Sequence, residues 1–225
     1  MTSLLLPALA LLATATPAVA YECPDYASEV DRLRELETNA RKGALNEDEK
    51  ACLEKAYASA DASQTGKNKI SRVLLVNAYA YSTKYWAELM ERHLDEVDRS
   101  DPDLAYLWAF YKFNTEGPAS AEEVVKWTET ALERKDVWTG DVFVSRVYGL
   151  MKLRAVAASA QWKSAEEQRI KGSSNDGIEE LRNIAKVYAR EWVDFAGVSG
   201  RDTEESLQVC LAAATNAKAC GVEEE

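Results

Sequence analysis

The sequence predicts an all-α fold built from antiparallel helical hairpins. Almost every segment repeats its apolar residues with the helical period of about 3.6 residues. No segment shows the alternation of a surface strand flanked by hairpin turns. Only five of the 225 residues are proline, whereas alanine, leucine, glutamate, lysine and arginine, which favour helices, are abundant. Helices of about 14 residues joined by short loops form antiparallel pairs.

Residues 1–20 contain no charged side chain and are typical of a secretory signal sequence. An apolar run from Leu4 to Leu12 is followed by small residues that end in Ala-Val-Ala before Tyr21, as at a cleavage site. The alternatives are a membrane anchor or a buried N-terminal helix, but the run is short for a bilayer and two prolines interrupt it. No other long apolar stretch follows. We therefore expect an exported protein, periplasmic or extracellular, that does not span a membrane.

Polar start residues and glycine stops define the first predicted helices. Asp25 can cap a first helix, which Gly43 ends. Asn46 with Glu49 has the pattern of a capping box and opens a second helix. The segment "DASQTGKN" is typical of a loop, and a strongly apolar third helix follows it.

The later helices start at similar signals. Asp101 can cap a helix whose first position is Pro102. Ser120 with Glu123 opens the next helix, and Thr139 opens the one after it. The predicted helices cover about 25–42, 46–60, 69–82, 84–97, 101–113, 120–134, 139–159 with a further helix to 169, 178–195 and 203–218.

The chain divides into three parts. Residues 1–20 are the signal, 21–200 form a helical-repeat domain, and 201–225 hold a C-terminal helix with a cysteine pair and an acidic tail. The four cysteines, Cys23, Cys52, Cys210 and Cys220, predict two disulfides in an exported protein. Three pairings are open, and the pairing of nearest neighbours would tie down each end of the fold. A zinc site is disfavoured because no C-x-x-C pair is present and the single histidine is distant in sequence.

A short motif occurs twice: Ile70-Ser71-Arg72-Val73 returns as Val144-Ser145-Arg146-Val147, and each copy opens an apolar helix. The stretch from Ser71 to Pro102 has large, small and aromatic residues on its first helix, apolar residues on its second and a closing Asp-Pro. These residues are Leu74, Ala78, Tyr81, Met90, Leu94, Val97 and Asp101-Pro102. In this pattern the chain resembles a degenerate tetratricopeptide-repeat protein over about Leu45 to Ala196. The resemblance implies hairpins stacked as a right-handed superhelix, with a concave groove for a peptide or partner protein.

The stretch "HLDEVDRSDPDL" joins the single histidine, His93, to a run of carboxylates between Asp95 and Asp103. His93 lies on an apolar helix stripe between Leu89 and Val97, which favours a buried, hydrogen-bonded histidine over a catalytic base. The carboxylates do not follow the spacing of a calcium loop, which disfavours such a loop. A weak cation site is nevertheless left open. No nucleophile elbow or phosphate-binding loop is present, and we predict neither a catalytic site nor a cofactor.

The formal net charge of −11 would repel nucleic acid and anionic lipid and is compatible with basic proteins. The favoured function is a scaffold or accessory subunit of the cell envelope that binds a protein or peptide. The alternatives are a small-molecule or glycan binder with an aromatic groove, and a carboxylate-dependent hydrolase without a motif. The oligomeric state is left open. Aromatic residues for an interface are Tyr79, Tyr81, Tyr85, Tyr106, Trp108 and Tyr111.

Overall fold

The computed structural model describes residues 21–26, 30–59, 63–79, 83–171 and 177–222, and these residues form helices and connecting turns without a strand. The predicted all-α class is therefore confirmed. The predicted signal sequence, residues 1–20, lies outside the described residues. The helices are α1 (Val30–Ala40), α2 (Glu47–Tyr57), α3 (Gln64–Tyr79), α4 (Thr83–Glu96), α5 (Pro102–Glu116), α6 (Ala121–Glu133), α7 (Gly140–Ile170), α8 (Ile178–Val198) and α9 (Glu204–Ala213), with short 3₁₀ helices η1 (Gly117–Ser120), η2 (Lys135–Val137) and η3 (Ala217–Cys220).

Two of the predicted helix starts have the expected capping geometry. The Asn46 side chain accepts a hydrogen bond from the Glu49 amide at 2.8 Å, and the Glu49 carboxylate accepts one from the Asn46 amide at 2.9 Å. Asp101 caps α5, and Pro102 is its first residue. Both starts were readable because a cap depends only on residues within one helical turn.

Several boundaries differ from the prediction. Asp25, the predicted cap of the first helix, is not adjacent to α1, which spans Val30–Ala40. Helix α3 begins at Gln64, inside the predicted loop, because the Ser63 hydroxyl accepts a hydrogen bond from the Gly66 amide at 3.0 Å and acts as its cap. The two helices predicted to meet near residue 159 are one helix, α7, since neither glycine nor proline interrupts its C-terminal half. Helix α9 ends at Ala213, and the side chain of Asn216 caps η3 instead.

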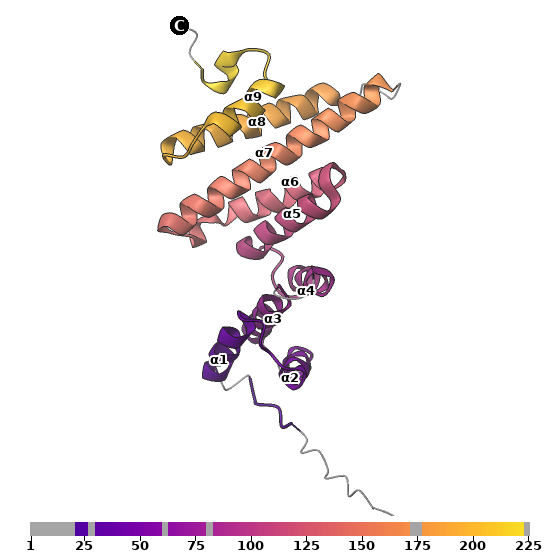
Figure 1. Cartoon of the computed structure of the whole chain (residues 1–225), viewed down its shortest axis with the longest axis vertical. Coiled ribbons are helices and arrows are strands. Elements are labelled where there is room, and N and C mark those ends of the chain that lie inside the picture. The colour runs from indigo at the N-terminus through magenta and orange to yellow at the C-terminus, as the bar shows by residue number, and fades with distance from the viewer. Residues whose placement is uncertain (1–20, 27–29, 60–62, 80–82, 172–176, 223–225) are drawn as a thin grey trace, which may run out of the picture.

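The helices form one elongated array (Figure 1). Helix α3 packs against α1, α2 and α4, and seven of its residues between Ile70 and Ala78 are buried. From α5 to α9 each helix packs on the next, and Figure 1 shows these helices one above another along the long axis. In the same view α2 and α4 are seen nearly end-on, so the chain changes direction at the α4–α5 turn. The right-handed superhelix of the tetratricopeptide resemblance remains a prediction.

The main hydrophobic core runs without interruption from Tyr26 to Ala157, through helices α1 to α7. Two smaller clusters join α7 to α8 and α9; Trp192, fully buried, is the largest side chain of one of them. The α4–α5 turn therefore connects two groups of helices that share one core. None of the described helices is long and apolar enough to cross a bilayer.

The four cysteines pair as nearest neighbours, one of the three pairings that the sequence left open. The sulfur atoms are 1.97 Å apart in Cys23–Cys52 and 2.02 Å apart in Cys210–Cys220, which is disulfide-bonding distance. The first pair ties residues 21–26 to α2, and the second ties α9 to η3. Two such pairs indicate an oxidising compartment outside the cytoplasm.

Replacing both cysteines of a pair by alanine should destabilise the fold more for the first pair than for the second. Loop-closure entropy gives about 3.6 kcal/mol for the separation of 29 residues and about 2.7 kcal/mol for the separation of 10. Urea unfolding of the two double variants measures both losses. Equal losses, or a larger loss for Cys210→Ala/Cys220→Ala, would contradict the loop-length argument.

Gly149 of α7 lets Tyr106 of α5 approach closely: a Cβ atom added at this glycine would lie 2.8 Å from the tyrosine hydroxyl. We expect Gly149→Ala to cost about 1 to 3 kcal/mol through this overlap, and Tyr106→Phe in the same chain to recover part of the loss. Gly197→Ala is the matched control, because nothing lies within 4 Å of its added Cβ. Thermal unfolding would overturn the close-approach argument if both alanine variants were equally stable.

Candidate functional site

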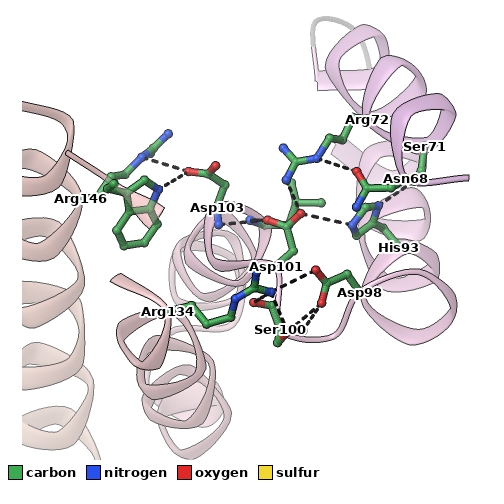
Figure 2. A network of polar contacts seen from close by, with 12 residues as sticks. Asn68, Ser71, Arg72, His93, Asp98, Ser100, Asp101, Asp103, Arg134 and Arg146 are labelled. Carbon is green, nitrogen blue, oxygen red and sulfur yellow. Dashed lines mark hydrogen bonds and ion pairs between the residues drawn. The ribbon is translucent and has the colours of Figure 1, made fainter. Parts of the chain in front are cut away.

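The polar cluster predicted in "HLDEVDRSDPDL" lies at the α4–α5 turn and is centred on the Asp101 carboxylate (Figure 2). Only 2% of this residue is exposed. One carboxylate oxygen accepts hydrogen bonds from the amides of Asp103, at 3.1 Å, and Leu104, at 3.2 Å. The other forms an ion pair with Arg72 of α3 and lies 3.5 Å from His93 Nε2 of α4. Asp101 therefore joins three helices through one side chain.

His93 is fully buried, as its place on the apolar stripe predicted. Its Nδ1 atom is hydrogen-bonded to the Ser71 hydroxyl at 3.0 Å, and its Nε2 atom faces Asp101 at the outer limit of hydrogen-bond length. Serine, histidine and aspartate thus stand in the order of a hydrolase triad. A nucleophile must reach its substrate, however, and Ser71 is fully buried in the middle of α3. The arrangement instead fits a structural role, in which the three side chains connect α3, α4 and the start of α5.

The buried Asp101 is held in its charged form by its neighbours. Burial by itself would raise the pKa of Asp101. The contact with His93, the charge of Arg72 and the amide of Leu104 outweigh burial and hold that pKa below its ordinary value. The charged form is therefore the one that the folded protein stabilises.

Three of the other carboxylates of the stretch, Glu96, Asp98 and Asp103, have a partner on another element or in the turn. Glu96 accepts a hydrogen bond from the Tyr57 hydroxyl at 2.9 Å. Burial, followed by this contact with Glu96, raises the pKa of Tyr57 to about 12. Asp98 accepts a hydrogen bond from the Ser100 amide at 2.9 Å and one from Arg134 at 3.2 Å. These contacts offset the unfavourable helix dipole at the end of α4.

Two arginines from the repeated motif flank the first turn of α5. Arg72, from the first copy, reaches Asp101, and Arg146, from the second copy on α7, lies 3.5 Å from Asp103. Asp103 also accepts a hydrogen bond from the Trp138 indole at 3.1 Å. Each of these two carboxylates is thus paired with a guanidinium group. Within the described residues, no three His, Cys, Asp or Glu side chains converge as metal ligands would.

The aromatic residues predicted for an interface are divided between core and surface. Trp108 is buried and stacks on Tyr111, and Tyr106 packs against α7. Tyr79 is 73% exposed, and Tyr85 is exposed and donates a hydrogen bond to Glu54 at 3.2 Å. Tyr81 lies outside the described residues. The interface prediction for these side chains stays a prediction, and only Tyr79 and Tyr85 present much of their surface to solvent.

An open surface over α6 and α8, called the α6–α8 groove below, was not predicted. It consists of two hollows of about 500 and 550 Å³, the first lined by α8 alone and the second by the end of α5, η1 and α6. The Tyr188 hydroxyl, in the first hollow, contacts Glu129, in the second. Val125, Ile184 and the half-exposed Val187 provide apolar surface along it. Apart from Ala119, the remaining lining residues are polar. They are Glu116, Ser120, Glu122, Glu123, Lys126 and Glu129 in the second hollow, and Glu180 and Asn183 in the first.

One sequence signal could have found this groove. The inward stripe of α8 already consists of buried small residues and a tryptophan, Ala185, Ala189, Trp192 and Ala196. Ile184, Val187 and Tyr188 are apolar positions on a second face, which a single buried stripe does not require. The contact with Glu129 holds Tyr188 between the two hollows of the groove, where burial, followed by the Glu129 hydrogen bond, raises the pKa of Tyr188 to about 12.

No protein-family model matches the chain, and no curated protein or solved structure is significantly similar to it.

Asp101→Asn keeps a good helix cap but removes the buried charge that faces Arg72 and His93. We expect a loss of about 1.5 to 3 kcal/mol at pH 7. Because the pKa of Asp101 is lowered on folding, its contribution is fully present above the unfolded value of about 3.9 and is lost as the pH falls through the folded pKa. The stability difference between the two proteins should therefore shrink below about pH 4.

Urea unfolding at pH 7 and near pH 3 measures this difference. Asp95→Asn is the control. Asp95 is exposed in the last turn of α4, so this substitution should change stability by about 0.5 kcal/mol or less. The argument for a stabilising buried charge at Asp101 would be contradicted by a loss of unfolding free energy that is independent of pH. An equal loss in Asp95→Asn would contradict it as well.

Proposed function

We propose that this is an exported helical-array protein that serves as a scaffold or accessory subunit in the cell envelope by binding a partner protein. The observation that carries the proposal is the open groove between α6 and α8. Its occupant is a basic amphipathic segment of the partner, such as a helix with one apolar and one lysine- or arginine-rich face. Such helices bind by laying their apolar face in a groove.

The shape and lining of the groove support a macromolecular occupant. Tyr188, which lines the first hollow, contacts Glu129, which lines the second, so an extended segment could cover both. Val187 is 49% exposed, and covering it removes apolar surface from water. An aromatic ring at the centre of an apolar strip is typical of interface centres.

The charges of the groove favour a basic occupant. Five glutamates line it and Lys126 is its single basic residue. Glu122 and Glu180 are exposed and have no polar partner among the described residues, so their charges are available to an approaching segment. The formal net charge of −11 adds a long-range attraction for basic partners.

The compartment and the sequence resemblance agree with this role. The two cysteine pairs at bonding distance are typical of proteins outside the cytoplasm, and the uncharged N-terminal segment is typical of an export signal. Stacked helical hairpins like those of tetratricopeptide proteins commonly present extended binding surfaces. Fold analogy alone does not identify a partner, which is why the groove residues carry the proposal.

A synthetic amphipathic helix of leucine and lysine, about 18 residues long, is a suitable probe. We expect it to bind the wild-type protein, and the same peptide with glutamate for lysine to bind at least tenfold more weakly. Val187→Asn should weaken binding of the basic peptide about fivefold to tenfold, because the lost apolar contact is worth about 1 to 1.4 kcal/mol. Fluorescence anisotropy of the labelled peptides measures both differences.

Val198→Asn is the matched control, because Val198 is 85% exposed at the end of the same helix and does not line the groove. Chemical cross-linking of the mature protein in envelope extracts should give a partner with wild type and Val198→Asn, linked through α6 or α8. Equal binding by Val187→Asn, or equal binding of the acidic peptide, would reject the groove.

A further inference from the structure

Another hollow lies at the other end of the array, around the first disulfide. It has a volume of about 630 Å³ and is lined by residues 23–26, Leu33 of α1, the C-terminal half of α2 and the first turns of α3. Pockets for small molecules have volumes of about 300 to 1,000 Å³. The helices that form this hollow are separate from those that form the α6–α8 groove.

The inner wall of this cavity is apolar. Tyr26, Leu33 and Ile70 are buried side chains that line it, and Ala56 and the Cys23–Cys52 disulfide complete the wall. The disulfide holds residues 23–26 against α2, so one side of the wall is fixed covalently. An apolar body of a ligand would therefore meet a preformed apolar surface.

The rim of the cavity is basic, in contrast to the rest of the protein. Lys55 of α2 and Lys69 of α3 line it and are exposed, and no carboxylate of the described residues forms an ion pair with either. Asp25 is the single carboxylate of the lining. In a chain of formal net charge −11, a cavity whose lining carries two lysines and one carboxylate is a local exception.

Further groups at the rim of the cavity would favour an anionic headgroup of a ligand. Ser63, Thr65 and Gly66 lie at the start of α3, where the helix dipole favours negative charge. The Gly66 amide is already bonded to the Ser63 hydroxyl, so the hydroxyl of Thr65 and the two lysines are the groups that an anion would meet. Lysine and hydroxyl donors at the mouth of an apolar cavity match a ligand with one anionic end and one apolar end.

We propose that this cavity binds a small amphipathic anion, with an apolar body against Leu33 and Ile70 and a carboxylate or phosphate headgroup between Lys55 and Lys69. The site is independent of the partner groove, since it shares no residue with it. The protein would then carry a small-molecule site in addition to its partner surface.

Decanoate, decyl phosphate and decyltrimethylammonium, each below its micelle concentration, test the charge and the source of the headgroup. We expect the two anions to raise the melting temperature of the wild-type protein and to bind in calorimetry, and the cation to do neither. Vesicles of phosphatidylglycerol separate a free ligand from a membrane surface. Sedimentation with these vesicles, without binding of the monomeric anions, would overturn the proposal.

Two pairs of matched variants test the location. Lys55→Gln/Lys69→Gln should weaken decanoate binding at least tenfold, whereas Lys42→Gln/Lys135→Gln, which makes the same change in net charge away from the cavity, should not. Ala56→Leu should weaken binding by reducing the space, and Ala51→Leu, on the exposed side of the same helix, is its control. Loss of binding in the control variants, or none in the cavity variants, would reject the site.

Binding of the basic peptide to the α6–α8 groove should be unchanged in all four variants. Failure of the cavity proposal is thereby distinguishable from failure of the partner proposal.

Discussion

The Asp101 carboxylate is the constraint on which the arrangement of the two helix groups depends. Its side chain is almost completely buried, so its charge is stable only where Arg72, His93 and the first amides of α5 surround it. These partners come from α3, α4 and α5. The direction in which α5 leaves α4 is therefore fixed by one buried charge, and α6 to α9 stack in succession on α5.

The two copies of the Ser-Arg-Val motif each place an arginine at the α4–α5 turn. Arg72 and Arg146 occupy the same place in the two copies, and they approach the first turn of α5 from α3 and from α7. A guanidinium on each side neutralises the two aspartates of Asp-Pro-Asp. Of these four side chains Asp101 alone is buried, so removing Arg72 would leave a buried charge without its ion pair.

The sequence allowed prediction of features that depend on neighbouring residues. The caps Asn46 and Asp101 are local, and the burial of His93 followed from apolar residues one helical turn away on each side. Its partner Ser71 could not be identified, because that contact depends on how α3 and α4 are aligned in space. The groove escaped prediction for a related reason. The sequence of α8 indicates that Val187 is apolar, but only the packing of α6 and α7 decides that it stays uncovered.

Burial divides the carboxylates of this acidic chain into two kinds. Asp101 and its neighbours at the junction are compensated by arginines and by helix amides, and they determine the shape of the array. Exposed pairs such as Arg32–Glu35 are screened by solvent and add little to stability, so the continuous apolar core must supply most of it. Glu122 and Glu180, in contrast, face solvent beside uncovered apolar side chains. Because these two charges contribute little to the stability of the fold, they are available for binding a partner. For this reason we assign the proposed function to the groove and not to the polar cluster at the α4–α5 turn.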